Sequence, residues 1–278
     1  MPSRQFLDIK ILWQPSIAHL SGSCLQDVET LKEKLECILP IFNTKLCAIY
    51  LRGSRVYGLN SPKSDLDLVI LLDPIDLKDL LLLKSSLRLL LDLTIGQYYI
   101  DFVLYCLMNS EIIVSHNITP AINLAIKNYT SFDLIYNSCL YYGIELKKCE
   151  FQSSDEFYST LTSVILLKIL QDLDKFKLQP NQHLISNIIK NTIRLVSTYE
   201  SKKNHIYLSI ARIKDSFDYI MDHNQVLKDD VMTIHGHLSS HLDDKINCNV
   251  IISSINNILN FIMNNIDLTL INDYKRNY

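Results

Sequence analysis

The sequence predicts an α/β (α+β) domain with a short mixed sheet over residues 1–150, followed by an all-α helical bundle domain over residues 151–278. In the first part, short runs rich in β-forming residues alternate with segments of helical spacing, which is typical of a sheet covered by helices. After residue 150, the successive segments all suit helices. Because no low-complexity linker separates the two parts, the boundary is predicted from this change of secondary-structure type.

Each predicted element rests on its own spacing of apolar residues. A first helix is expected over residues 25–39, where leucine and valine recur at helical spacing and Ser23 is placed to cap the N-terminus. Another helix is expected over residues 75–93. Three strands are expected, at residues 45–52, 65–72 and 97–106. The bundle is expected to contain helices near residues 155–176, 183–200, 204–222, 226–243 and 249–265.

Length and composition exclude several classes of protein. The 278 residues are enough for one large domain or two ordinary ones. No apolar run is long enough to cross a membrane and no secretory signal is visible, so no membrane partner is expected. The seven cysteines are scattered without a CxxC pair, which argues against disulfide and zinc frameworks and favours a reducing, cytoplasmic compartment. The formal charge of −3 gives no general attraction to nucleic acid, and the oligomeric state stays open.

Glycine is scarce, with six in the whole chain, yet Gly53 and Gly58 lie only five positions apart. A strand that runs into Gly53 and Ser54 predicts a short helical turn, whose N-terminal N–H groups suit a phosphate. Glycine lets the backbone approach the phosphate closely, and the Ser54 hydroxyl adds a donor. Arg55 is close enough to pair with phosphate oxygens, or it is equally well solvated.

Three aspartates complete the pattern. Asp65 and Asp67 are two positions apart on a predicted strand, so their carboxylates point to one face and repel each other unless a cation lies between them. That arrangement suits Mg²⁺. Asp101 stands alone in a hydrophobic strand, and it completes a triad if this strand pairs with residues 65–72.

Each of these motifs taken alone is weak evidence of function. A Gly-Ser dipeptide carries little information, an Asp-x-Asp pair is more often a solvated strand start, and Asp101 by itself could be an edge-strand charge that prevents aggregation. The order is far more specific: a strand, Gly-Ser, a turn, Asp-x-Asp on a strand, a helix, and a strand with one aspartate.

The stretch GSRVYGLNSPKSDLDLVI resembles the active-site signature of the polymerase-β-like nucleotidyltransferase superfamily, and the layout is most similar to bacterial aminoglycoside adenylyltransferases. The resemblance implies two Mg²⁺ ions held by three carboxylates and ATP as nucleotidyl donor. It leaves open whether the third carboxylate is the base, a metal ligand or both. The matching positions are Gly53, Ser54, Asp65, Asp67 and Asp101; Arg55 and Ser64 are further nucleotide-binding candidates, and Tyr57, Lys202 and Lys203 are possible cleft residues.

The activity implied by the resemblance is Mg²⁺-dependent transfer of a nucleoside monophosphate, AMP from ATP, to a hydroxyl of a small-molecule acceptor. An aminoglycoside-like compound is the expected acceptor, while the nucleotide preference stays open. Two alternatives remain. One is transfer to a protein side chain or a tRNA end, as in toxin–antitoxin nucleotidyltransferases, and the other is a catalytically silent nucleotide-binding or interaction module.

Overall fold

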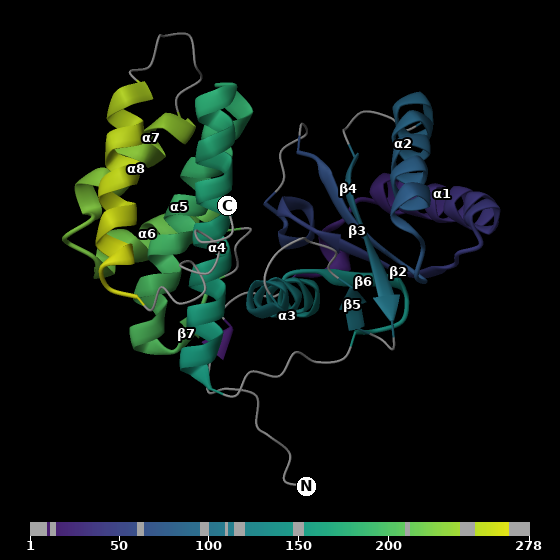
Figure 1. Ribbon diagram of the computed structural model, residues 1–278, viewed down its shortest axis with the longest axis horizontal. Helices are drawn as coiled ribbons and strands as arrows, with labels where there is room; N and C mark the ends of the chain where they lie inside the picture. Colours follow the sequence, from purple (N-terminus) through teal and green to yellow (C-terminus); the bar gives the residue numbers. More distant parts are fainter. Residues whose placement is uncertain are drawn as a thin grey trace, which may run out of the picture. The chain divides into compact units, whose positions relative to one another are not determined.

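The computed structural model describes residues 10–11, 15–59, 64–94, 100–108, 111–113, 120–146, 153–208, 212–239 and 248–266. The chain divides into two compact units, which we call the sheet unit and the helical unit (Figure 1). The sheet unit comprises Gln14–Asn117 and Ile126–Cys149, and the helical unit comprises Met1–Trp13, Ile118–Ala125 and Glu150–Tyr278. The predicted fold class, an α/β part followed by a helical part, is confirmed, although the helical unit also contains a short two-stranded sheet.

The sheet unit contains a five-stranded mixed sheet in the order β5-β4-β3-β2-β6. The central strand β3 pairs in parallel with β4 and antiparallel with β2, and the two edge strands are antiparallel to their neighbours. The strands are β2 (Leu46–Arg52), β3 (Leu66–Leu72), β4 (Ile100–Met108), β5 (Glu111–Ile113) and β6 (Cys139–Gly143). Successive β3 residues Leu68, Val69 and Ile70 are all buried, so both faces of the sheet are covered.

One sheet face packs against α3 (Pro120–Tyr136). Leu134 of this helix lies in a buried cluster with Tyr50 of β2 and Val69 and Leu71 of β3. Because side chains on a strand alternate between faces, Arg52 and Asp67 continue the same face beyond this core. Arg52 and Asp67 therefore belong to a polar row, described below, which lies at the end of this apolar layer.

The first long helix, α1, extends over Gly22–Ile38, three residues earlier than predicted. Its cap is Ser21 instead of Ser23, because the extended backbone at Ser21 lets its hydroxyl accept a hydrogen bond from Cys24 N at 3.2 Å. Ser23 lies inside the first turn. The next helix, α2, extends over Leu77–Thr94 and agrees with the predicted segment.

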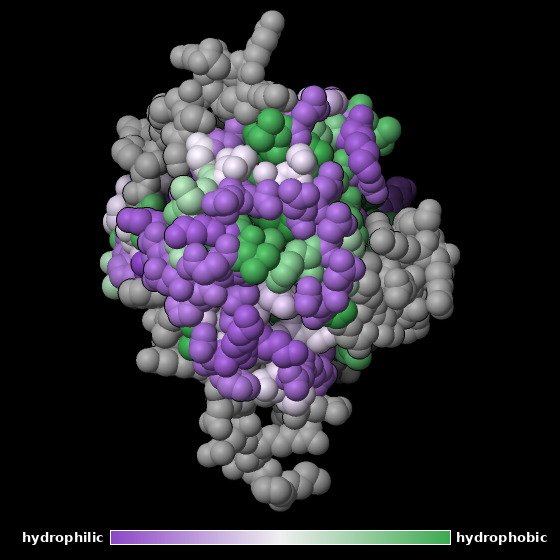
Figure 2. Space-filling model, turned by 90° about the vertical axis from the view of Figure 1, so that its left-hand side faces the viewer, coloured by the Kyte–Doolittle hydropathy of each residue, from purple (hydrophilic) through white to green (hydrophobic). Residues whose placement is uncertain are grey.

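The helical unit consists mainly of helices. Ser153 and Asn181 cap the first two, each through a side-chain oxygen that accepts a backbone N–H. The helices are α4 (Ser154–Leu178), α5 (Gln182–Ser201), α6 (Ile213–His223), α7 (Lys228–Ser239) and α8 (Cys248–Met263). The face shown in Figure 2 is mostly hydrophilic around a smaller apolar area. None of the helices in the described ranges has the length and apolarity needed to span a membrane.

One expected helix is partly wrong. The segment 204–222 was expected to be helical throughout, but Ile206–Tyr207 forms the short strand β7, and α6 begins only at Ile213. The strand forms because it pairs in parallel with β1 (Lys10–Ile11), nearly two hundred residues away in the sequence. The Tyr158 hydroxyl also donates to the Ile206 carbonyl at 2.6 Å, which ties β7 to α4.

Candidate active site

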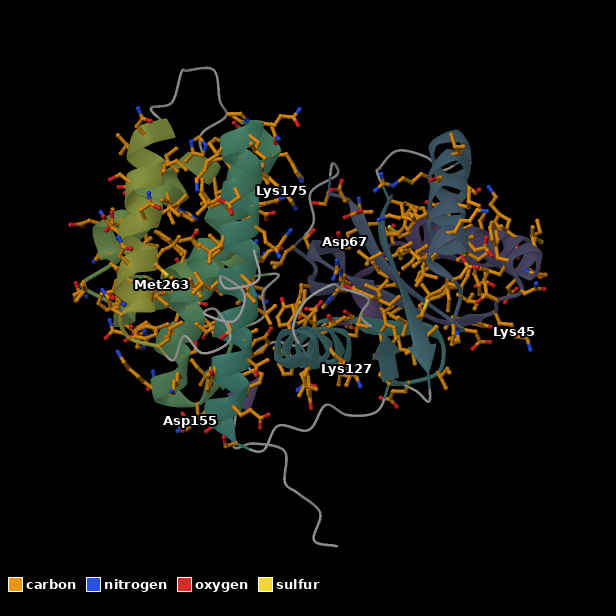
Figure 3. All side chains as sticks on the ribbon, in the orientation of Figure 1. Lys45, Asp67, Lys127, Asp155, Lys175 and Met263 are labelled. Carbon is orange, nitrogen blue, oxygen red and sulfur yellow. The ribbon has the colours of Figure 1, made fainter. Side chains whose placement is uncertain are left out.

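Three charged residues form a row across one end of the three central strands of the sheet. Arg52 of β2 lies opposite Asp67 of β3, and Asp67 lies opposite Asp101 of β4. Residues directly opposite on neighbouring strands point to the same face. The expected pairing of the Asp67 and Asp101 strands is therefore confirmed, with Asp67 half-buried and Asp101 exposed. Figure 3 labels Asp67 near the beginning of β3.

Asp65 stands just before β3 instead of on it, because the strand begins at Leu66, and its side chain is exposed. Within the described parts of the chain, no three His, Cys, Asp or Glu side chains gather closely enough to hold a metal ion. The structure therefore does not bring Asp65, Asp67 and Asp101 together into one metal-binding cluster, and metal binding by them stays a prediction. The donor set still suits Mg²⁺, which takes one or two carboxylates together with phosphate oxygens.

Gly53 brings the two halves of the sequence motif into contact. Its backbone has φ 81° and ψ −168°, a conformation that is essentially restricted to glycine. A Cβ atom at this position would lie only 1.9 Å from Oδ2 of Asp67, so the Asp67 carboxylate lies directly against the Gly53 backbone. The glycine is therefore required both by the conformation of the chain and by the side chain beside it.

The turn after Gly53 is a short 3-10 helix, η3 (Ser54–Tyr57), as predicted. It ends at Gly58, whose φ of 68° and ψ of 21° place it in the left-handed region. The Ser54 carbonyl accepts from Leu59 N at 2.9 Å, which closes the turn. Ser54 is half-buried at its first position, and binding of a nucleotide by Ser54 stays a prediction.

Arg55 occupies a different environment from the solvated or phosphate-facing one that was expected. Its side chain is buried, and its Nε donates to the carbonyls of Ser64 and Asp65 at 3.0 and 3.2 Å. The Arg55 side chain points inward because the 3-10 turn directs it toward the segment before β3. Arg55 therefore positions the backbone that carries Asp65, while a nucleotide contact by Ser64, which is half-buried, stays a prediction.

Replacing Arg55 with alanine is expected to lower the free energy of unfolding by about 1–3 kcal/mol, because the partly buried carbonyls of Ser64 and Asp65 lose a charged donor. Arg55→Lys keeps the charge but not the fork of donors and should lose a smaller part of the stability. Urea denaturation of the two variants checks this. A change below about 0.5 kcal/mol in Arg55→Ala, as at an exposed site, would contradict the buried role.

Tyr57, expected as a possible cleft residue, has a buried side chain, and a role beside a cleft stays a prediction. Its hydroxyl donates to Oδ1 of Asn137 at 3.3 Å, and Asn137 Nδ2 donates to Asp133 Oδ1 at 2.9 Å. Asp133 Oδ2 in turn accepts from Arg52 Nη1 at 3.2 Å. One hydrogen-bonded chain thus joins both ends of the Gly53–Gly58 turn to α3.

Sequence reasoning missed Arg52 and Asp133. Burial lowers the pKa of Arg52, but the neighbouring Asp133 and Asp67 carboxylates raise it, and the pKa lies above its ordinary value. The guanidinium is therefore charged. The one available signal was an arginine at the last position of an otherwise apolar strand, directly before Gly53.

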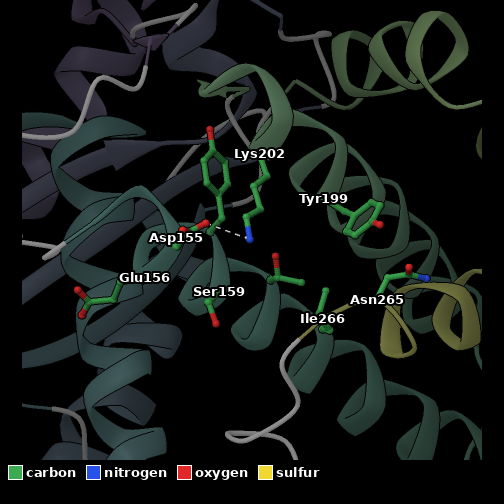
Figure 4. A pocket seen from close by; sticks show the side chains of 9 residues that line it. Asp155, Glu156, Ser159, Tyr199, Lys202, Asn265 and Ile266 are labelled. Atoms are coloured by element: carbon green, nitrogen blue, oxygen red, sulfur yellow. Dashed lines mark ion pairs between the residues drawn. The ribbon is translucent and has the colours of Figure 1, made fainter.

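The two lysines expected near a cleft both lie in the helical unit. Lys202 lines a cavity of about 380 Å³ and forms an ion pair with Asp155 at 3.1 Å (Figure 4). Lys203 pairs with the buried Glu200 at 3.0 Å and lies 5.8 Å from the centre of the Tyr199 ring. Glu200 raises the pKa of Lys203 by hydrogen bonding to it. A role of either lysine toward a nucleotide or an acceptor stays a prediction.

Comparison with known proteins shows the fold. No family model matches the sequence, and no curated protein matches it. Among solved structures, the chain is similar to the spectinomycin adenyltransferase AAD(9) from Enterococcus faecialis, crystallised with ATP and spectinomycin. The TM-score is 0.54 at 15% sequence identity, and the match covers 84% of this chain and 97% of that chain. The chain therefore shares the fold of this adenyltransferase, with a mixed sheet followed by a helical part.

Proposed function

We propose that the protein transfers AMP from ATP to a hydroxyl group of a small molecule, with Mg²⁺ as the required cation. The observation that carries this proposal is the register of β3 and β4, which sets Asp67 beside Asp101 on the face where the Gly53 turn begins. The likeness in fold to an adenyltransferase solved with ATP and spectinomycin supports the reaction class. It also makes an aminoglycoside-like compound the first acceptor to test.

The chemistry of the site follows from its charges. Asp65, Asp67 and Asp101 would hold Mg²⁺, which when bound neutralises phosphate charge and lowers the pKa of a coordinated hydroxyl. Gly53 has no side chain to keep a phosphate from its backbone, and Ser54 offers a hydroxyl donor beside it. Positioning and charge neutralisation then supply most of the rate, because the protein forms no covalent bond.

Asp101 is exposed and lies next to Asp67 at the open end of the row. A carboxylate in that position accepts the proton of the acceptor hydroxyl as a general base, ligates the cation, or does both. Replacing Asp101 with glutamate distinguishes these roles. The longer side chain reaches further toward an acceptor hydroxyl, but it moves the carboxylate oxygens away from a cation held between this residue and Asp67.

The test is to incubate the protein with each nucleoside triphosphate and Mg²⁺ across a panel of hydroxyl-bearing acceptors, spectinomycin among them. Pyrophosphate release and the mass of the adduct are measured. We expect acceptor-dependent pyrophosphate release with ATP and an adduct heavier by one AMP, both lost when EDTA removes the Mg²⁺. Asp174→Asn, which removes an exposed carboxylate of the helical unit, is the matched control for the Asp67→Asn variant discussed below and should keep the full rate.

Two outcomes would replace this proposal. Labelled nucleotide that appears in protein or tRNA of a cell lysate would indicate a macromolecular acceptor. Absence of both pyrophosphate release and a nucleotide-induced shift in melting temperature would indicate a catalytically silent interaction module.

A further inference from the structure

Arg52 is the cation of the polar row. It ends β2, directly before Gly53, and its register partner is Asp67. Its side chain is about one-third exposed, at 31%, whereas the Asp133 carboxylate that it pairs with is 7% exposed. The guanidinium is thus anchored at one end by a buried carboxylate and reaches the surface on the face of the Gly53 turn.

Stability alone gives little reason for this ion pair. Removing two charges from water costs several kcal/mol per ion, and well-packed apolar residues often stabilise a protein as well as a buried ion pair does. The apolar layer of Tyr50 and Val69 lies next to the pair on the same face, so apolar side chains are compatible with these surroundings. An ion pair with one buried carboxylate, placed beside the carboxylates of the site, instead indicates a requirement for a fixed positive charge there.

The hydrogen bonds of the pair also determine where that charge points. Among the described residues, Arg52 donates to Asp133, which leaves further N–H groups of the guanidinium for another acceptor. Asp133 is itself held by Asn137, and Asn137 is bound by Tyr57 at the other end of the turn. The position of the guanidinium and the shape of the turn are therefore set by the same side chains.

We propose that Arg52 binds the polyphosphate of the nucleotide, and that Asp133 is the positioning residue that directs its guanidinium there. This inference rests on the proposed function, which supplies the nucleoside triphosphate. Guanidinium groups bind phosphate oxygens through charge-assisted and often bidentate hydrogen bonds. A cation at this place also neutralises the charge that develops on the departing pyrophosphate.

The experiment measures binding of ATP, AMP and inorganic pyrophosphate to the full chain by calorimetry in the presence of Mg²⁺. Arg52→Gln should weaken ATP and pyrophosphate binding about tenfold to a hundredfold, the range that one charge-assisted hydrogen bond supplies. Binding of AMP, which lacks the polyphosphate, should change less than about threefold, because its affinity does not include that bond. Arg88→Gln, at an exposed arginine of α2, is the matched control and should bind all three ligands as the wild type does.

Two further variants separate contact from folding. Arg52→Lys keeps a positive charge and should recover part of the pyrophosphate affinity that Arg52→Gln loses. Asp133→Asn should weaken the binding of pyrophosphate more than the binding of AMP. If Arg52→Gln does not fold, Arg52→Lys is compared with the wild type instead. A larger loss of affinity for pyrophosphate than for AMP in Arg52→Lys then supports the proposal.

Equal losses for AMP and pyrophosphate, or no loss in any folded Arg52 variant, would overturn the inference and leave the proposed function intact. A wild-type protein that binds none of the three ligands would overturn both. The two failures are therefore distinguishable in one set of titrations.

Discussion

Asp67→Asn is expected to lower nucleotidyl transfer roughly 10²–10³-fold, the loss seen when one preorganised electrostatic group is removed from an active site. Asp67 is the middle residue of the row, with Arg52 on one side and Asp101 on the other, and its carboxylate lies against Gly53. Asparagine keeps the size and the packing but removes the charge that would hold Mg²⁺. The initial rate of acceptor-dependent pyrophosphate release measures the effect.

The stability of this variant should change by less than about 1 kcal/mol, because loss of attraction to Arg52 is offset by relief of repulsion from Asp101. A low rate in a protein with an unchanged melting temperature therefore reports on chemistry instead of folding. Raised Mg²⁺ should restore part of the rate, since the remaining carboxylates still bind the ion weakly. A variant that keeps the wild-type rate at low Mg²⁺ would rule out Asp67 as a ligand.

The pairing of Asp67 with Asp101 could be predicted because each lies in an apolar run that identifies a strand without knowledge of its neighbours. An aspartate within such a run is unfavourable for strand formation, so its presence indicates a function. The single further assumption was that the two strands are adjacent, and the parallel ladder between β3 and β4 confirms it. The fold class follows for the same reason, since long periodic segments can be recognised locally.

The burial and the contacts of the side chains around these positions could not be predicted. Arg55 and Tyr57 lie in a four-residue 3-10 turn, which is too short for periodicity to show that both are buried. The ion pair of Arg52 with Asp133 joins residues 81 positions apart, and α3, which carries Asp133, has no counterpart among the predicted elements. Contacts of this kind depend on how elements pack, and one sequence alone does not contain that information.

Gly53→Ala is expected to lose both stability and activity, for two separate physical reasons. The backbone conformation at Gly53 is essentially restricted to glycine and should cost about 1–3 kcal/mol when alanine is forced into it. In addition, the new methyl group would lie 1.9 Å from Oδ2 of Asp67, so the carboxylate has to rotate away. The rate of transfer should therefore fall about as far as in Asp67→Asn, even in molecules that remain folded.

Gly58→Ala is the matched control, because it introduces the same methyl group at the other end of the same turn. Gly58 also has a positive φ, so alanine there should cost about 1–2 kcal/mol of backbone strain. The nearest described atoms to its methyl group, however, would belong to His19, whose ring lies at 3.5 Å, which is an ordinary contact. Urea denaturation should show a comparable loss of stability in the two variants, and the transfer assay should show a large loss only in Gly53→Ala. Equal rates in the two variants would mean that the contact between Gly53 and Asp67 has no part in the reaction.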